Sequence, residues 1–542
     1  TGCTWREGKV SAPPSFQEPF RRYCEGGWIS ISEDYDVGGQ CLPLTIQQAC
    51  NELFFSANHS LAGYMGLSHS AAKAIEVHGT SRQKKIYMAP LYAGRFAGGM
   101  NLTEPQAGSD VGAIKVKAIR RGNGTYAIQG SKIFITGGEQ DLTENIVHIV
   151  LARIDGDPGG TKGLSCFIVP KIRVREDGSL GEWNHIACAG IEHKMGMKGS
   201  ATCTLNYGET GECLGELLGE ERDGIRVMFH MMNEQRLLVG LQGLAQGGTA
   251  FLHALKFAKE RFQGAPLGGS SALQAPIVRH PDVLNNLMIM KAQTEGMRAL
   301  LFFAVSCIDR IAAGAVDPEK QRLRHLIELL TPVCKAYCTE KGFDVCVRAM
   351  QVHGGYGYCK EYRVEQFVRD CKIMSIYEGT NGIQAIDLFG RKIRMQNGEL
   401  FRTVKATMRE TIAEAAGGRT FAPYAVDLAL LVDALEILTD ALRREGSPED
   451  AFLQYSRASA YLDAFGDILL GWMFLWQALV ADKKLRNPTL EAADESFCRE
   501  KIQTASFYLG TMLPVAAGKI QALGKENRAL LELRKLPIFA RE

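Results

Sequence analysis

The amino-acid sequence predicts a mainly α-helical protein with a central β domain, followed by a further helical extension. Apolar residues recur at helical spacing before residue 98 and again from about residue 224. Between these zones, short β-rich runs alternate with Gly- and Asp-containing turns, which indicates an antiparallel sheet or barrel. A chain of 542 residues is also too long for one ordinary hydrophobic core. We therefore expect four domains: a helical domain 1–97, a β domain 98–215, a helical bundle 216–395 and a helical extension 396–542.

The first two zones are predicted from short runs of characteristic residues. In the N-terminal zone, Leu44–Phe55 and Ala71–His78 have helical periodicity and are joined by Gly and Pro breaks. The β zone is predicted from four runs rich in β-branched and apolar residues: Thr125–Gln129, Lys132–Thr136, Val147–Ile154 and Gly163–Val169.

The third and fourth zones are predicted to be helical. The span Met228–Gln263 lacks proline, and no strand leads into its Gly240-x-x-Gly243 pattern, so this pattern is not a dinucleotide-binding loop. The glycines of this span are expected to allow close helix packing: Gly240, Gly243, Gly247 and Gly248. In the fourth zone, leucines at heptad spacing before a stop at Gly446 and Pro448 predict a packed helical bundle: Leu428, Leu431, Leu435, Leu438 and Leu442.

Bulk composition argues against several classes of protein. With 46% hydrophobic and 23% charged residues, the chain has the composition of an ordinary soluble globular protein. A formal net charge of +2 provides no field for a polyanion, so no nucleic-acid partner is expected. The most apolar stretch, Ile468–Ala481, is too short to cross a bilayer and predicts a buried helix, so no transmembrane segment is expected.

The cysteines indicate a reducing compartment. Fifteen cysteines are thinly spread over the chain and include no C-x-x-C pair, which argues against a disulfide scaffold. Cys334 and Cys338 lie four apart on a predicted helix, where two core thiols are expected and a metal site is not. We expect a cytoplasmic protein, with the mitochondrial matrix as the alternative.

The segment Ile376–Gln384 is the most informative stretch of the chain. It places the carboxylate of Glu378 in an apolar and aromatic neighbourhood, directly before a Gly-Thr turn. Burial raises the pKa of a carboxyl group, and a glutamate tuned in this way suits removal of a weakly acidic C–H proton. The alternatives are that Glu378 caps a helix N-terminus or forms a buried ion pair with Arg369 or Lys372.

Two long stretches carry a family resemblance. The run from Met100 to Asp110, MNLTEPQAGSD, resembles the first signature of acyl-CoA dehydrogenases. The run from Gln351 to Gln384 resembles their second signature, in the right order and at the right separation. The resemblance continues through Lys132–Thr136 and His193–Gly196 and covers about residues 15 to 395. On these stretches the chain is identified as a member of the acyl-CoA dehydrogenase family.

The ends of the chain resemble one branch of that family. One branch of the family includes the 3-(methylthio)propanoyl-CoA dehydrogenases and related long-chain enzymes. The chain resembles this branch in its N-terminal segments Gly2–Trp5 and Tyr23–Trp28 and in its extension 396–542. The resemblance implies a helical domain, a β domain and a helical bundle. It also implies α,β-dehydrogenation of an acyl-CoA to a trans-2-enoyl-CoA, with FAD as cofactor and an electron-transfer flavoprotein as acceptor. It does not indicate the acyl group.

The resemblance also implies which residue is the catalytic base. Glu378 matches the position of the base in most members and would remove the α-proton, while the backbone N–H of the base helps to polarise the thioester oxygen. Some members carry the base on an earlier helix, directly before an arginine. Here Gln235 occupies that position before Arg236, and Glu234 lies one residue earlier, about 100° around the helix. Glu378 is therefore preferred over Glu234, and Arg236 is expected to support it, with a plain salt bridge to Glu234 as the alternative.

Further site residues are carried over position by position. The resemblance implies that the flavin ring and pyrophosphate are met by Met100, Leu102, Thr103, Gly108, Ser109, Phe134 and Thr136. It assigns Arg261 and Gln263 to the adenine end of FAD, which a neighbouring subunit usually binds. It assigns the turn against the pyrophosphate to Gln351, Gly354 and Gly355, and the turn after the base to Thr380 and Gly382. It assigns the acyl-CoA to Ser109, Asn233, Arg236, Tyr377 and Gly379. Phe134 stands where the family often has Trp, and Gly264 where many members have Phe. At these two places the chain departs from the family pattern, so the family's flavin stacking and adenine packing are not carried over. Shared sites imply a homodimer or homotetramer.

Two other functions share these features. An acyl-CoA oxidase differs in letting oxygen reoxidise the flavin, which sequence separates poorly. An alkylation-response flavoprotein that associates with DNA would need a basic C-terminal face, whereas this C-terminal zone mixes acidic and basic residues.

Overall fold

The computed structural model describes residues 2–267, 274–444, 446–525 and 527–539, without the side chains of residues 230 and 233. The chain forms two compact units, Thr1–Leu238 and Val239–Glu542. The division falls inside the long helix α6 (Gly224–Glu260), whose first part belongs to the first unit and whose remainder belongs to the second.

The first unit begins with a β-hairpin and a set of helices. The hairpin pairs β1 (Thr4–Arg6) with β2 (Lys9–Ser11). The helices that follow are α1 (Gln17–Glu25), α2 (Leu44–Ala57), α3 (His59–His78), α4 (Ser81–Gln83) and α5 (Ala89–Tyr92). The predicted helix at 71–78 is thus the end of the longer helix α3. The N-cap of α3 is Asn58, whose side-chain oxygen accepts from the Leu61 N–H.

The β domain of this unit is a mixed sheet. Its strands are β3 (Phe96–Asn101), β4 (Lys117–Arg120), β5 (Thr125–Thr136), β6 (Asn145–Ile154), β7 (Leu164–Pro170), β10 (Ile186–Ile191), β11 (Thr202–Tyr207) and β12 (Leu214–Leu217). Because β4 pairs with both β5 and β6, the path β4-β5-β12-β7-β6 closes into a ring, as the predicted barrel requires. A separate hairpin joins β8 (Ile172–Val174) to β9 (Leu180–Trp183).

The predicted antiparallel arrangement holds for most strand pairs of the sheet but not for all of them. Strand β6 runs parallel to β3 and to β4, while its other neighbour β7 is antiparallel. Two of the predicted runs, 125–129 and 132–136, form the single strand β5. The alternation of side chains along a strand predicts the strand itself. It does not indicate whether the neighbouring strand runs parallel or antiparallel.

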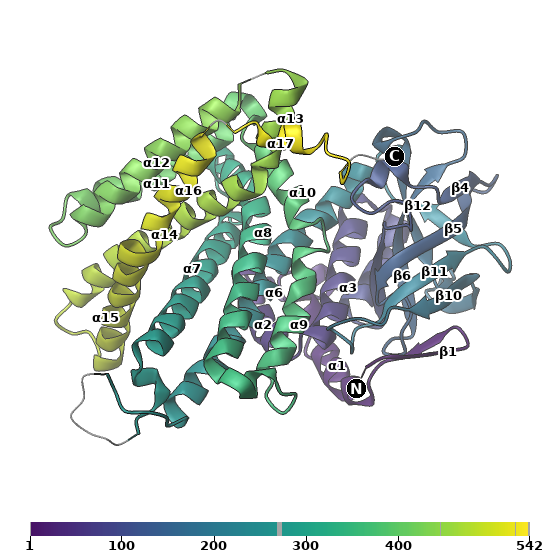
Figure 1. Ribbon diagram of the computed structural model, residues 1–542. Coiled ribbons are helices and arrows are strands. Elements are labelled where there is room, and N and C mark those ends of the chain that lie inside the picture. The colour runs from purple at the N-terminus through teal and green to yellow at the C-terminus, as the bar shows by residue number, and fades with distance from the viewer. Residues whose placement is uncertain (1, 268–273, 445, 526, 540–542) are drawn as a thin grey trace. The chain divides into compact units, whose positions relative to one another are not determined.

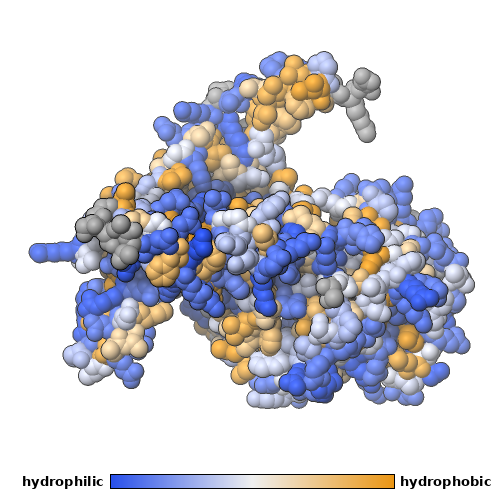
Figure 2. Space-filling view, turned by 60° about the horizontal axis from the view of Figure 1, so that its bottom comes forward, coloured by the Kyte–Doolittle hydropathy of each residue, from blue (hydrophilic) through white to orange (hydrophobic). Residues whose placement is uncertain are grey.

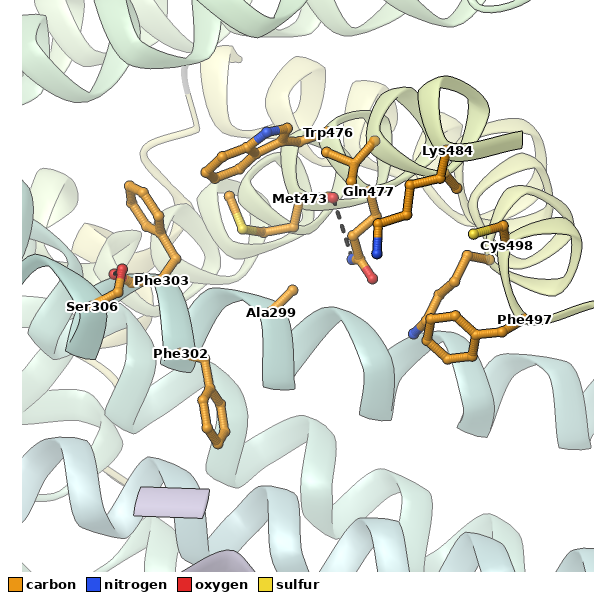
Figure 3. Close-up of a pocket in the computed structure, with 13 residues that line it drawn as sticks. Ala299, Phe302, Phe303, Ser306, Met473, Trp476, Gln477, Lys484, Phe497 and Cys498 are labelled. Atoms are coloured by element: carbon orange, nitrogen blue, oxygen red, sulfur yellow. Dashed lines mark hydrogen bonds between the residues drawn. The ribbon is translucent and has the colours of Figure 1, made fainter. Parts of the chain in front are cut away.

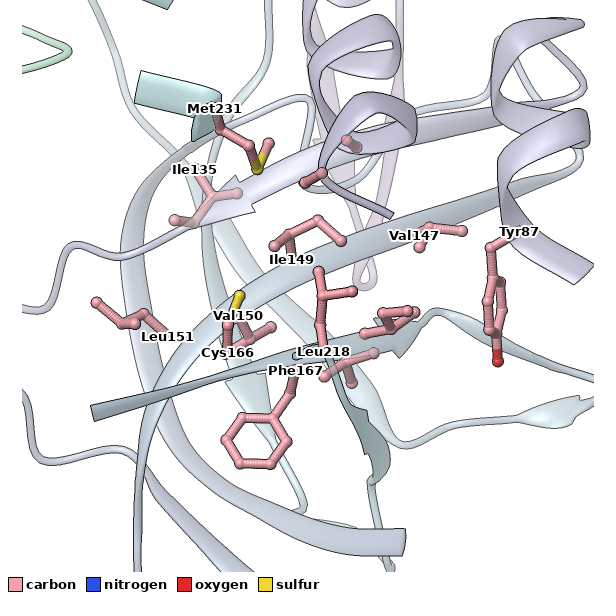
Figure 4. Close-up of a cluster of buried hydrophobic side chains, with 14 of the residues drawn as sticks. Tyr87, Ile135, Val147, Ile149, Val150, Leu151, Cys166, Phe167, Leu218 and Met231 are labelled. Carbon is pink, nitrogen blue, oxygen red and sulfur yellow. The ribbon is translucent and has the colours of Figure 1, made fainter. Parts of the chain in front are cut away.

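The core of the first unit lies between this sheet and its helices. Figure 4 shows side chains of β5, β6 and β7 gathered with Tyr87, Leu218 and Met231 in one apolar cluster. Helix α3 packs on β3, where Gly98 has its Cα against the backbone of α3; a Cβ at Gly98 would lie 2.7 Å from the Leu67 carbonyl oxygen. The strand that leads to the first signature is therefore held directly by a helix.

The regular elements of the second unit, within its described residues, are helices (Figure 1), and an isolated β-bridge joins Phe262 to Pro276. After α6 come α7 (Pro281–Ala312), α8 (Glu319–His353), α9 (Val364–Lys372) and α10 (Asn381–Ile386). The predicted close packing of the α6 glycines is confirmed: a Cβ at Gly243 would lie 2.7 Å from the Cys338 carbonyl oxygen of α8. Cys334 and Cys338 are fully buried core thiols, and all fifteen cysteines of the chain are free.

The C-terminal extension forms the rest of this unit. Its helices are α11 (Glu399–Ala416), α12 (Ala422–Leu442), α13 (Pro448–Ser456), α14 (Ala458–Leu485), α15 (Ala492–Phe507), α16 (Pro514–Gly524) and α17 (Ala529–Leu533). The five leucines at heptad spacing are all buried on α12, as a packed bundle predicts. The last described helix and the residues after it expose apolar side chains, among them Leu530, Leu533 and Phe539. Figure 2 shows that apolar patches alternate with hydrophilic surface on the face that it draws.

The apolar stretch at 468–481 belongs to the longer helix α14, so its expected length was wrong. The helix has 28 residues and would be long and apolar enough to cross a membrane by length and composition alone. However, 83% of its apolar window is buried inside the described structure, which fits the predicted core helix.

Candidate active site

Glu378 lies in a short loop between α9 and α10, with its side chain half-buried. Its φ of 55° is in the left-handed region that side chains other than glycine rarely adopt, and Gly379 follows at φ 81°. Tyr377 packs against the core of the unit and donates its hydroxyl hydrogen to Gln242. The pKa of Tyr377 is raised by burial and then by the charge of Glu378, so the two side chains are electrostatic neighbours.

The N-cap role considered for Glu378 is filled by Thr380, and the two basic residues considered as its partners also contact other side chains. Thr380 is the N-cap of α10, since its hydroxyl oxygen accepts from the Ile383 N–H at 3.2 Å, so the N-cap interpretation of Glu378 was wrong. Arg369 donates to both carboxylate oxygens of Glu365, at 2.6 and 2.7 Å. The ammonium of Lys372 lies 4.9 Å from the centre of the Phe343 ring.

The competing carboxylate Glu234 is part of a buried ion-pair network in the first unit. His69 lies between Glu234, at 2.6 Å from Nδ1, and Glu33, at 2.9 Å from Nε2. Burial lowers the pKa of His69, but the two carboxylates outweigh it and raise the pKa to about 10, so the imidazole is charged at neutral pH. Ser70 also donates to Glu234, at 3.1 Å. Glu234 is therefore committed to a cation, which disfavours it as a free base.

The rest of this helix segment is buried beside the same network. The Gln235 amide donates to the Ser70 hydroxyl at 2.5 Å and to the Gly66 carbonyl at 3.3 Å. Arg236 is buried on α6. The side chain of Asn233, predicted to contact substrate, lies outside the described residues. Sequence inspection missed His69 and Glu33, because nothing in their local pattern signals partners that are 165 and 36 residues away from His69.

Several residues of the first signature are brought together with β5. The Ile133 N–H donates to the Thr103 carbonyl at 2.9 Å, and the Lys132 ammonium donates to the Leu102 carbonyl at 2.8 Å. Lys132 also pairs with Glu104 at 2.8 Å, and both side chains are buried. These bonds place segment 102–104 beside the strand that carries Phe134 and Thr136. Met100, on β3, and Leu102 are half-buried and pack against the apolar core of the first unit.

A second group of predicted residues gathers in the second unit. The guanidinium of Arg261 lies 5.7 Å from the Tyr356 ring and donates to the Gln263 side chain at 3.4 Å. Tyr356 directly follows Gly354 and Gly355, at the end of α8, where Gln351 is exposed. The structure thus brings the predicted adenine and pyrophosphate residues of this unit to one surface, and Gly382 lies in the first turn of α10 after its Thr380 cap.

Three family models match the chain. Models of the acyl-CoA dehydrogenase middle and C-terminal domains match residues 99–209 and 222–392, and a model described as acetyl-CoA dehydrogenase C-terminal like matches 401–534. The chain is 38% identical over 513 residues to a 3-methylmercaptopropionyl-CoA dehydrogenase of Ruegeria pomeroyi, covering 94% of this chain and 86% of the relative.

A second relative matches over a similar span. The chain is 36% identical to the broad-specificity linear acyl-CoA dehydrogenase FadE5 of Mycobacterium tuberculosis, covering 97% of this chain and 87% of the relative. The chain belongs to the acyl-CoA dehydrogenase family. The fold agrees with a Bacillus anthracis acyl-CoA dehydrogenase crystallised with FAD, at a TM-score of 0.75 and 21% identity, covering 96% of this chain and 84% of that one. The predicted fold class is confirmed, and the chain is an FAD-dependent oxidoreductase of acyl-CoA thioesters.

The residues of this acyl-CoA dehydrogenase fit an FAD on three observations. Phe134 on β5 is 58% exposed, with a φ of 58°, and so is an exposed aromatic residue on the strand beside segment 102–104. Gly108 and Ser109 are exposed, and a Cβ at Gly108 would meet no atom within 4 Å. The same holds at Gly354 and Gly355 in the second unit. An aromatic wall and open glycine backbone are what a flavin ring and its phosphates require.

A separate pocket lies among helices of the second unit. It has a volume of about 430 Å³ and opens between α7, α14 and α15, where Trp476, Phe303 and Phe497 line it (Figure 3). None of the predicted site residues lines this pocket. Within the described residues, no group of three or more His, Cys, Asp or Glu is placed to hold a metal ion.

Proposed function

We propose that this acyl-CoA dehydrogenase converts a saturated acyl-CoA to the trans-2-enoyl-CoA, with Glu378 as the base. FAD, when bound, supplies the acceptor for the hydride that leaves the β-carbon. The protein must remove the α-proton, and Glu378 is the carboxylate of the loop between α9 and α10. The thioester oxygen is polarised in this proposal by the backbone N–H of Glu378, which stabilises enolate character as the proton leaves.

The observation that carries the proposal is the state of the Glu378 loop. Glu378 is half-buried and has a left-handed backbone conformation, and Thr380 caps the helix that follows it. The competing carboxylate Glu234 is paired with a charged histidine. A carboxylate held in a strained loop is a functional candidate, since strain of this kind persists only where the surroundings hold it.

The test is anaerobic flavin bleaching by a panel of acyl-CoAs. The panel should include linear acyl-CoAs of increasing length and 3-methylmercaptopropionyl-CoA, because the two relatives act on these classes. Glu378→Gln should lower the bleaching rate by about 10²–10⁴-fold, the usual contribution of a general base. Glu234→Gln is the matched control and should stay within about tenfold of the unchanged enzyme.

Each outcome assigns the base. Bleaching that survives in Glu378→Gln but is lost in Glu234→Gln would refute Glu378 as the base. A protein that retains FAD and is bleached by no member of the panel would refute the proposed reaction for those acyl groups.

We also propose an electron-transfer flavoprotein as the acceptor and a homo-oligomer as the working form. Arg261 and Gln263, carried over as contacts to a neighbouring subunit's adenine, are exposed, and Phe262, Tyr356 and Tyr358 expose aromatic surface around them. Exposed aromatic residues of this kind are enriched at subunit interfaces. Light scattering of the FAD-loaded protein tests the oligomer, and a monomer with full FAD content would refute it. Reoxidation of the bleached enzyme by an electron-transfer flavoprotein, compared with oxygen, tests the acceptor.

A further inference from the structure

A fully buried lysine contacts the loop that carries Glu378. Lys335 lies in the middle of α8 with 0% of its surface exposed. Its ammonium donates to the Gly379 carbonyl at 2.8 Å and to the Asn381 side-chain oxygen at 3.0 Å. The Thr339 hydroxyl donates to the same Asn381 oxygen at 3.2 Å, and the Asn381 amide donates to the Ala336 carbonyl at 3.2 Å. One face of α8 therefore holds both ends of segment 379–381.

The held segment directly follows the strained residue. Glu378 and Gly379 have φ values of 55° and 81°, and a glutamate keeps such a conformation only where its neighbours hold it. The Gly379 carbonyl accepts from Lys335 and, at a longer 3.4 Å, from the Gln384 amide. Burying an ammonium is costly, because the charge loses its hydration. Lys335 therefore restrains the Gly379 peptide group strongly, and its burial costs free energy of folding.

We propose that Lys335 is a positioning residue for Glu378. By fixing the Gly379 carbonyl and Asn381 from α8, it holds the base in the backbone conformation that aims its carboxylate at the substrate. The inference rests on the proposed role of Glu378 and adds to it a residue on a different helix, 43 positions earlier in the chain.

The perturbation is Lys335→Met in the FAD-loaded enzyme. Methionine keeps an unbranched apolar chain but donates no hydrogen bond, so the Gly379 carbonyl retains only the longer bond from Gln384. A misplacement of about 1 Å in a reacting group can lower a rate by about 10²-fold. We expect the limiting bleaching rate per bound flavin to fall about 10- to 100-fold, with half-saturation by acyl-CoA changed less than about threefold. Lys335→Gln, which keeps a donor, should recover part of the rate.

A second buried lysine provides the matched control. Lys392 is 2% exposed and pairs with Glu328 in the same unit. Lys392→Met removes the same kind of buried ammonium and should lower thermal stability, while the bleaching rate per bound flavin stays near that of the unchanged enzyme. Hydrogen exchange gives a readout that does not depend on activity: amides of 379–384 should exchange faster in Lys335→Met than in Lys392→Met.

The outcomes separate this proposal from the one on which it rests. If Glu378→Gln abolishes bleaching and Lys335→Met keeps the full limiting rate, the positioning role is refuted and the base remains. If Lys335→Met and Lys392→Met lose rate equally per bound flavin, the effect is general destabilisation and the proposal is again refuted. If Glu378→Gln bleaches normally, the proposed base itself fails. Should Lys335→Met not fold, Asn381→Ala loosens the same loop, and an unchanged limiting rate and exchange in that variant would overturn the proposal.

Discussion

We predict that the buried ion pair of Lys132 and Glu104 stabilises the position of segment 102–104 beside β5. Lys132→Met removes one partner and leaves the carboxylate buried at 3% exposure. Glu104 would still accept from the Lys115 and Val116 N–H groups, at 2.7 and 3.0 Å, while the Leu102 carbonyl would lose its ammonium donor. Breaking a buried pair from one side costs about 3–5 kcal/mol, and the surviving donors favour the lower end of this range.

Hydrogen exchange of the β5 amides measures this loss without assuming that a protein of two units unfolds in one step. A loss of about 3–5 kcal/mol corresponds to exchange faster by about two to four orders of magnitude, at about 1.36 kcal/mol per tenfold change. The experiment belongs near pH 7, because burial lowers the pKa of Lys132 to about 8 even though Glu104 opposes the shift, and the pair is charged below that pH. FAD content should fall as well, since segment 102–104 faces the proposed flavin site.

The control is the exposed pair of Lys117 and Asp155, whose side chains are both 62% exposed. Lys117→Met should change stability by less than about 0.5 kcal/mol. Replacing both Lys132 and Glu104 by methionine should recover part of the lost protection, because no buried charge is then left alone. Unchanged β5 exchange in Lys132→Met, or equal effects of Lys132→Met and Lys117→Met, would refute the reasoning.

Three further predictions concern other parts of the fold. The folded pKa of His69, about 10, exceeds its usual value of 6.5, so its stabilising effect is complete below pH 6.5 and is lost between pH 6.5 and 10. His69→Gln should therefore flatten the decline of stability with pH over that window, by at most about 1.4 kcal/mol per pH unit, and an unchanged slope in pH-dependent denaturation would contradict it. Gly342→Ala drives a methyl group into the backbone of α6 and should destabilise by about 1–3 kcal/mol, whereas Gly518→Ala, in open space on α16, should be neutral or stabilise by up to about 1 kcal/mol in urea denaturation. Thr380→Ala removes the cap of α10 and should cost about 1 kcal/mol of local stability, seen as faster amide exchange at 381–386; equal exchange would contradict the capping role.

Local patterns predicted much of the secondary structure. The buried leucines of α12, the end of α12 at Leu442 before Gly446 and Pro448, and the long proline-free helix α6 all follow from periodicity and from residues that stop helices. The glycines of α6 were correctly expected at a close helix contact. The same patterns did not predict strand direction, because a buried strand shows a similar pattern of side chains beside a parallel or an antiparallel neighbour.

Site residues divide along the same line. The two signatures indicate the family and place Glu378 at the base position, because a long run of specific residues carries information that composition does not. No local pattern marks His69, whose partners Glu33 and Glu234 come from other segments, or Lys335, whose acceptors lie in the loop after α9.

The sequence by itself determined the family, the order of helical and β zones and the residues of the base loop. Tertiary structure alone placed Glu234 against the charged His69 and Lys335 against the loop that follows Glu378. The physical reason is that a buried charge is tolerated only where distant segments supply its partners, and those pairings form when the chain packs. Glu234 and Glu378 are both glutamates in the sequence, and the imidazolium of His69 and the ammonium of Lys335 give them different environments.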